Sequence, residues 1–149
     1  MKIVIALGSN MGDSNSHLHH AIDLLGQSVE IVKVSSFFKT APVGGPPQDD
    51  YLNAVLIAES AIDPLDLLVL LQEIEALSGR VREVPWGPRT LDLDLISYGD
   101  LEIHEPHLDI PHPRAHERTF VLEPWLEIDP LADLVGHGPI RELLAQIKR

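Results

Sequence analysis

The order of apolar patterns along the chain constrains its fold more than any other feature. Four short segments rich in apolar, β-branched and aromatic residues have the character of strands. They lie at residues 2–7, 31–38, 51–58 and 90–97. One helical pattern follows the first strand and another follows the third, so the predicted order is βαββαβ. This order is typical of a ferredoxin-like antiparallel sheet, and the predicted fold class is α+β.

Both helices carry end signals as well as an apolar stripe. Asp13 or Ser14 can cap the first helix, which is expected to end near Gly26. Asp63 caps the second helix and Pro64 opens it. Apolar residues recur at helical spacing in both segments: Leu18, Ile22 and Leu25 in the first, and Leu67, Leu71, Ile74 and Leu77 in the second, which is expected to end at Gly79.

The last third of the chain is predicted to be a C-terminal elaboration of this core. Residues 108–118 are rich in turn formers, residues 119–128 have a helical pattern that Pro124 interrupts, and a final helix lies near residues 139–148. No linker, repeat or low-complexity segment divides the sequence. We therefore expect a single domain over residues 1–149.

Composition excludes several classes of protein. The absence of cysteine excludes disulfides, thiolate metal sites and thiol catalysis. A net charge of −12 argues against nonspecific binding to nucleic acid, which depends on a basic surface. No apolar run approaches the roughly 18 residues of a membrane span. We expect a soluble cytoplasmic protein that binds neither nucleic acid nor membrane.

The segment LDLDL alternates leucine with aspartate, the pattern of a half-buried strand. Leu91, Leu93 and Leu95 would share one face, and Asp92 and Asp94 the other. The two carboxylates would lie about 6.6 Å apart and repel by roughly 2.5 kcal/mol at an effective dielectric near 20. A magnesium ion, which prefers oxygen ligands and substrate phosphates, would relieve that repulsion. The alternative is a solvated acidic edge.

Five arginines cluster between residues 80 and 118, where no lysine occurs: Arg80, Arg82, Arg89, Arg114 and Arg118. Arginine suits phosphate and carboxylate oxygens, although these side chains could also pair with surface acids. Arginines beside a carboxylate pair favour phosphoryl transfer, in which positioning and charge neutralisation dominate. His112 is interpreted as a hydrogen-bond donor to phosphate.

Two other classes of function stay open on these residues. One is a non-enzymatic ferredoxin-like module that binds a small ligand. The other is a metal-dependent hydrolase that uses Asp92, Asp94, His112 and His116. Neither a P-loop nor a dinucleotide-binding glycine motif is present.

Several motifs in order resemble one family. LGSN lies near the start, SSFFKTAPVG precedes YLNAV, and GRVR, WGPRTLDLDL and PHPRAHERTFVLEPW follow. Together they resemble the 6-hydroxymethyl-7,8-dihydropterin pyrophosphokinases of folate biosynthesis over nearly the whole chain. The resemblance implies an ATP-dependent diphosphotransferase. Such an enzyme moves the β,γ-diphosphate of ATP to the pterin hydroxymethyl group and releases AMP.

The resemblance also implies roles for individual residues. It makes Asp92 and Asp94 ligands of two Mg²⁺ ions and, with Arg82 and Arg89, the catalytic residues. Contacts with ATP, the co-substrate, are implied for Gln72, Glu75, Arg80, Trp86, Leu95, His112 and Arg118. Contacts with the pterin are implied for Thr40, Val43, Tyr51, Asn53 and Phe120. A monomer that binds these two substrates is expected.

Several of these residues have plainer interpretations. Tyr51 and Phe120 could be core aromatics. Gln72 and Glu75 could form the solvent side of an amphipathic helix. Trp86 could belong to the core, although we expect it to close over the nucleotide as part of a lid.

Overall fold

The computed structural model describes residues 1–41, 47–78 and 90–148. Its main sheet has five strands: β1 (Lys2–Ser9), β2 (Glu30–Val34), β3 (Phe38–Thr40), β4 (Tyr51–Glu59) and β5 (Asp92–Tyr98). Four α-helices are described: α1 (Ser14–Leu25), α2 (Pro64–Leu77), α3 (Thr119–Ile128) and α4 (Ile140–Ile147). A short 3-10 helix, η1 (Ala115–Glu117), precedes α3. None of the helices in the described ranges has the length and apolarity needed to cross a membrane.

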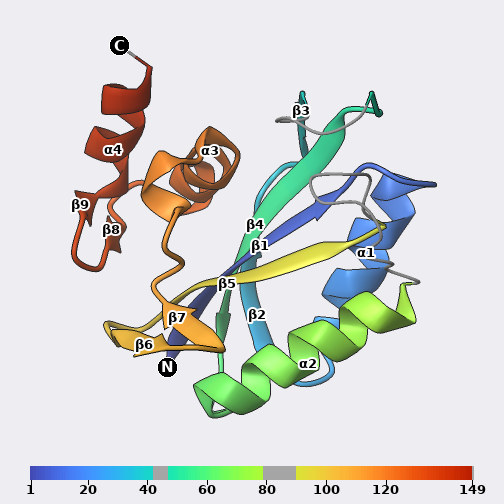
Figure 1. The fold of residues 1–149 in the computed structure, drawn as a ribbon, viewed down its shortest axis with the longest axis horizontal. Helices are drawn as coiled ribbons and strands as arrows, with labels where there is room; N and C mark the ends of the chain where they lie inside the picture. The colour runs from blue at the N-terminus through green and yellow to red at the C-terminus, as the bar shows by residue number, and fades with distance from the viewer. Residues whose placement is uncertain (42–46, 79–89, 149) are drawn as a thin grey trace.

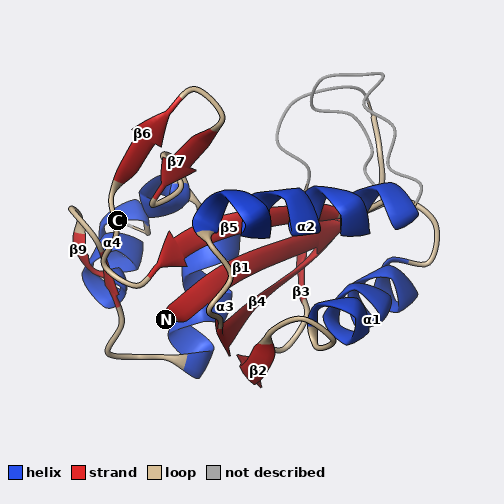
Figure 2. Cartoon of the chain, turned by 90° about the horizontal axis from the view of Figure 1, so that it is seen from below, coloured by secondary structure: helices blue, strands red, loops and turns tan. Residues whose placement is uncertain are grey.

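The strands are ordered β2-β4-β1-β5, with β3 also paired to β4, and every pair is antiparallel. With β2 and β3 counted as one interrupted strand, this is the order expected of a ferredoxin-like βαββαβ core. The predicted α+β fold class is confirmed. Figure 1 shows α1 and α2 on one side of the sheet and α3 and α4 on the other, and Figure 2 shows the same layers from below.

Alternation along the strands divides the interior into two cores. On one face, Ile3, Ile5 and Leu7 of β1 pack with the buried residues of α1 and α2. On the other face, Val4 and Ala6 pack with the core that contains α3 and α4. The leucines of LDLDL belong to the first core, so Asp92 and Asp94 point to the second face, as predicted.

The start of α1 follows the predicted capping. Asp13 is the N-cap, and its carboxylate accepts hydrogen bonds from the Ser16 backbone N–H at 3.2 Å and from the Ser16 hydroxyl at 3.0 Å. The backbone hydrogen bond from Ser16 is the main cause that lowers the pKa of Asp13. Pro64 is the first residue of α2, as expected, whereas α2 ends at Leu77 and Gly79 lies outside the described residues.

The prediction of one strand over residues 31–38 is wrong. The structure has β2 and β3, separated at Ser35. The Ser35 hydroxyl accepts a hydrogen bond from the Val55 N–H at 2.9 Å, and the Ser36 N–H donates to a Glu127 carboxylate oxygen of α3 at 2.6 Å. These side-chain bonds replace part of the backbone ladder, because serine and glutamate oxygens compete for its donors.

The predicted interruption at Pro124 is also wrong, because α3 is continuous from Thr119 to Ile128. A proline removes the donor to the carbonyl four residues earlier. Here that carbonyl belongs to Phe120 in the first turn, so the loss lies near one end of the helix. Burial of Val121, Leu122 and Trp125 holds the rest of the helix against the sheet.

Two small hairpins were not predicted. They are formed by β6 (Ile103–Glu105) with β7 (Leu108–Ile110), and by β8 (Asp133–Leu134) with β9 (Gly138–Pro139). Strands of two or three residues are too short for a recognisable alternation of apolar and polar residues. The final helix, α4, occupies the predicted place.

Strand β5 contains a β-bulge at Ile96. Val4 of β1 pairs with Ser97, but the next residue, Ile5, pairs with Leu95, so Ile96 is an extra residue. Its carbonyl accepts a hydrogen bond from the His112 N–H at 2.9 Å. The segment that follows β7 is thereby attached to the edge of β5, beside the two aspartates.

Candidate active site

A row of small and polar residues crosses the face of the sheet that carries α3. Gly8 of β1 pairs with Asn53 of β4 on one side and with Asp92 of β5 on the other. Ala6 pairs with Asp94 in the next row. Because glycine and alanine are small, the central strand leaves space between the acids and the amide. That space is the floor of a cavity of about 630 Å³.

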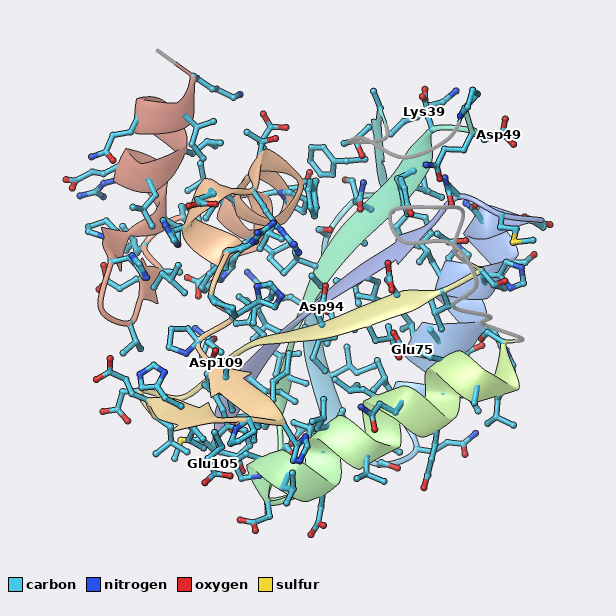
Figure 3. The ribbon with its side chains drawn as sticks, viewed as in Figure 1. Lys39, Asp49, Glu75, Asp94, Glu105 and Asp109 are labelled. Atoms are coloured by element: carbon cyan, nitrogen blue, oxygen red, sulfur yellow. The ribbon has the colours of Figure 1, made fainter. Side chains whose placement is uncertain are left out.

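The cavity collects many of the predicted residues from distant parts of the chain. Those that line it are Thr40, Tyr51, Asn53, Asp92, Asp94, His112, Arg118 and Phe120. Figure 3 shows Asp94 on β5, on the side of the strand away from α2. Further lining residues were not predicted as site residues: Ala6, Leu7, Gly8, Ala41, Arg114, Glu117 and Thr119. Of these, Arg114 already stood out in the arginine cluster, and alternation in β1 could have indicated Gly8.

The acidic side of the cavity faces a cation. Asp92 and Asp94 are half-buried, and a guanidinium nitrogen of Arg118 lies 3.9 Å from an Asp94 carboxylate oxygen. With side-chain exposures of 24% for Arg118 and 43% for Asp94, this ion pair is open to solvent and contributes little to stability. It leaves the carboxylates accessible from the cavity.

The donor set fits a magnesium ion held jointly with phosphates. Two carboxylates on one strand face, beside a cavity with room for water and phosphate, are the protein ligands that Mg²⁺ commonly uses. No group of three or more histidine, cysteine, aspartate or glutamate side chains that could hold a metal occurs among the described residues. The described part of the chain therefore contains no site at which protein side chains alone would supply all the ligands of a metal ion.

His112 is held in one tautomer. Its Nδ1 accepts a hydrogen bond from the Arg114 N–H at 3.2 Å, so the proton of the neutral ring lies on Nε2. Burial is the main cause that lowers the pKa of His112; Asp94 opposes this effect, and Arg118 and Arg114 add to it. The side chain is thus a neutral donor near pH 7 at the cavity wall, as the interpretation of His112 requires.

We expect His112 to make stability depend on pH. In the unfolded chain its pKa returns to about 6.5, so that chain binds more protons than the folded one between this value and the lower folded pKa. The favourable contribution is complete above about pH 6.5 and is lost as the pH falls toward the folded pKa. His112→Gln should flatten this dependence, as measured by urea unfolding between about pH 7.5 and about pH 5.5 without nucleotide or divalent cation.

The exposed His107 supplies the control, since His107→Gln removes a histidine from a turn outside the cavity. Equal slopes for the His112→Gln variant and the unchanged protein would contradict the expectation.

The other end of the cavity is aromatic and amidic. Tyr51 and Phe120 are partly buried, and the Arg118 guanidinium carbon lies 5.4 Å from the centroid of the Phe120 ring. Asn53 is buried, with 6% exposure, and its Nδ2 donates to the Thr40 hydroxyl. Both aromatic rings therefore border the cavity, and Phe120 also packs against the core that contains α3 and α4, in agreement with the plainer interpretation.

Three predicted nucleotide contacts do not line the cavity. Gln72 is exposed on α2, whereas Glu75 is buried and its carboxylate accepts a hydrogen bond from the Leu93 N–H at 2.9 Å. Figure 3 shows Glu75 between α2 and β5. Leu95 is buried in the core with α1 and α2. The interpretation of Gln72 and Glu75 as the solvent side of an amphipathic helix is thus wrong for Glu75. The nucleotide contacts of Gln72, Glu75 and Leu95 stay predictions.

Five predicted site residues lie outside the described ranges: Val43, Arg80, Arg82, Trp86 and Arg89. His116, which the hydrolase alternative requires, does not line the cavity. It stacks on His137 with ring centroids 4.1 Å apart. The ligand set of that alternative is therefore not brought together.

Comparison with known proteins matches most of the chain to a single family. Residues 4–130 match the family model for 7,8-dihydro-6-hydroxymethylpterin-pyrophosphokinase (HPPK). The chain is 47% identical over 126 residues to the 2-amino-4-hydroxy-6-hydroxymethyldihydropteridine pyrophosphokinase of Bacillus subtilis, covering 83% of this chain and 75% of that protein. It is 43% identical over 145 residues to the bifunctional protein FolKE of Lactococcus lactis, covering 96% of this chain and 41% of FolKE.

A solved structure shares the fold. The crystal structure of Plasmodium falciparum HPPK-DHPS A437G superposes with a TM-score of 0.79 at 14% identity, covering 97% of this chain and 45% of that one. The chain thus spans less than half the length of the bifunctional FolKE and of the HPPK-DHPS chain. By the match of its residues 4–130 and by its identity to the Bacillus subtilis protein, the chain belongs to the HPPK family.

Proposed function

We propose that the chain transfers the β,γ-diphosphate of ATP to the hydroxymethyl group of 6-hydroxymethyl-7,8-dihydropterin and releases AMP. The observation that carries the proposal is the arrangement of one cavity. Its acidic pair, the neutral donor His112 and the cationic Arg118 lie beside a wall that contains Tyr51, Asn53 and Phe120. A phosphate chain and a flat heterocycle can therefore meet there. Family membership and the names of the relatives agree with this reaction.

The roles follow from the chemistry of the lining groups. Asp92 and Asp94 would hold two Mg²⁺ ions, which supply charge neutralisation on the transferring diphosphate when bound. His112 Nε2–H and the Arg118 guanidinium donate hydrogen bonds to phosphate oxygens. In the transfer, the pterin hydroxyl oxygen forms a bond to the β-phosphorus and its proton is lost to water, while the bond between that phosphorus and the oxygen shared with the α-phosphate breaks and AMP leaves. The chain's contribution is positioning and electrostatic complementarity.

The pterin would occupy the aromatic end. Tyr51 and Phe120 offer ring faces for stacking, and Asn53 offers an amide for the polar edge of the heterocycle. Residues 43, 80, 82, 86 and 89 keep the roles that the family resemblance implies. We further propose that the protein acts as a monomer and as one pyrophosphokinase domain.

One assay separates the proposal from its alternatives. Purified protein is incubated with Mg²⁺ and ATP, with and without the hydroxymethyl pterin, and the nucleotides are resolved by chromatography. AMP that appears only with pterin supports the transfer. ADP or free phosphate formed without pterin would favour a hydrolase, and pterin binding with no turnover would favour a ligand-binding module. Either of these results would reject the proposal.

A further inference from the structure

The orientation of the Asn53 amide is set by a neighbour on the short strand β3. Asn53 pairs with Phe38 and Tyr51 pairs with Thr40 across β3 and β4. The Thr40 hydroxyl oxygen accepts a hydrogen bond from Asn53 Nδ2. Since Asn53 is only 6% exposed, few other partners compete for this amide nitrogen. The bond therefore restricts rotation of the amide about its last torsion.

The amide oxygen lies on the side of Gly8. A Cβ atom at Gly8 would be 3.1 Å from Asn53 Oδ1, which is tighter than ordinary contact. The absence of a side chain at Gly8 therefore provides the space that the amide oxygen occupies. Gly8, Thr40 and Asn53 all line the cavity. The nitrogen is thus engaged with Thr40, while the oxygen remains an acceptor beside the floor of the cavity.

An acceptor at this place selects a ligand edge that donates. The amino-pyrimidinone edge of a pterin carries an amino group and an adjacent ring N–H, both donors. A rotated amide would instead aim donors at the cavity and select ring edges that accept. The two orientations therefore make opposite predictions for which heterocycles bind.

We propose that Thr40 is a positioning residue for pterin recognition through its side chain: by accepting from Asn53 Nδ2, its hydroxyl holds Asn53 Oδ1 as the acceptor for the amino-pyrimidinone donors. This role is distinct from the direct contact of Thr40 with the pterin that the family resemblance implies. The inference rests on the proposed function, because it concerns the same pocket and the same substrate.

The test compares Thr40→Val with Thr40→Ser. Valine has the shape of threonine without its oxygen and suits a strand, whereas serine keeps the hydroxyl. Loss of one hydrogen bond to a buried amide should weaken binding of 6-hydroxymethyl pterin about tenfold in Thr40→Val. Serine should restore the affinity to within about threefold of the unchanged protein. The affinity for a non-hydrolysable ATP analogue reports on general damage and should change less than about twofold.

Selectivity supplies the readout that a merely structural role would not change. The preference for the pterin over an analogue that lacks the 2-amino group should fall in Thr40→Val and recover in Thr40→Ser. Gly8→Ala, which presses on the same oxygen, should weaken pterin binding too, and its effect should be smaller in the Thr40→Val background than in the unchanged protein.

Three results would overturn the inference. They are a Thr40→Val variant that binds pterin as tightly as the unchanged protein, equal losses in the valine and serine variants, and a parallel loss of ATP affinity. All three presuppose an unchanged protein that forms AMP with pterin. If the unchanged protein forms none, the proposed function fails first and the inference fails with it, so the two failures are distinguishable.

Discussion

Replacing Asp94 by alanine is expected to lower the rate of AMP formation by at least about a thousandfold while the chain stays folded. The carboxylate lines the cavity from β5 and shares its strand face with Asp92. Without it, the Mg²⁺ ions that would neutralise the phosphates lose one of their two carboxylate ligands. Asp92→Ala should have a similar effect, and both rates are measured as AMP released at saturating ATP, pterin and Mg²⁺.

Stability should respond differently from activity. In the absence of Mg²⁺, removing one of two neighbouring carboxylates relieves repulsion, so the free energy of unfolding should stay within about 1 kcal/mol of the starting value or rise. Asp23→Ala is the matched control, because Asp23 is exposed on α1 and does not line the cavity. A chain with both Asp92 and Asp94 replaced that still released AMP at a normal rate would disprove the assignment.

Trp125→Ala is expected to lower the free energy of unfolding by about 3–5 kcal/mol. Trp125 is 2% exposed and belongs to the core shared by α3, α4 and the second face of the sheet. Its removal leaves a large cavity under the helix that carries Phe120. Urea unfolding monitored by circular dichroism measures the loss, and pterin affinity should fall with it.

Two controls isolate the cause of that loss. Trp125 Nε1 is buried and has no hydrogen-bond partner among the described residues, so Trp125→Phe keeps most of the packing and removes an unsatisfied donor. It should cost less than about 1.5 kcal/mol. Leu131→Ala changes a side chain that is 79% exposed and should cost less than about 0.5 kcal/mol. A cost below about 1 kcal/mol for Trp125→Ala would show that α3 does not depend on this contact.

Sequence reasoning recovered those parts of the fold that depend on periodic patterns. The alternation of Leu91 to Leu95 placed the aspartates on the correct face, and capping by Asp13 located α1. It missed the break at Ser35, because the hydrogen bonds that replace the ladder there come from Val55 and Glu127. Neither partner can be identified from local sequence.

The candidate active site was likewise predictable where local patterns determine it and not where it depends on contacts between distant residues. Types of residue and their spacing indicated Asp92, Asp94 and His112, while the pterin side came from resemblance. All of these line one cavity except Val43, which lies outside the described residues. Gly8 was missed because its place beside Asp92 depends on strand register, and Arg114 stood out only as a member of the arginine cluster. The burial of Glu75 was missed for a similar reason. A carboxylate on a helix reads as solvated unless the backbone donor that it meets, the Leu93 N–H, is known.

At the extra residue of β5, Ile96, the side chain and the main chain serve different parts of the structure. The side chain of Ile96 fills the core under α3, whereas its carbonyl holds the backbone of His112. Substitution at position 96 can therefore alter the packing of that core without changing the bond that fixes the edge of the cavity. The width of the cavity beside His112 therefore depends on the main chain, and substitutions of the side chain at position 96 can leave that width unchanged.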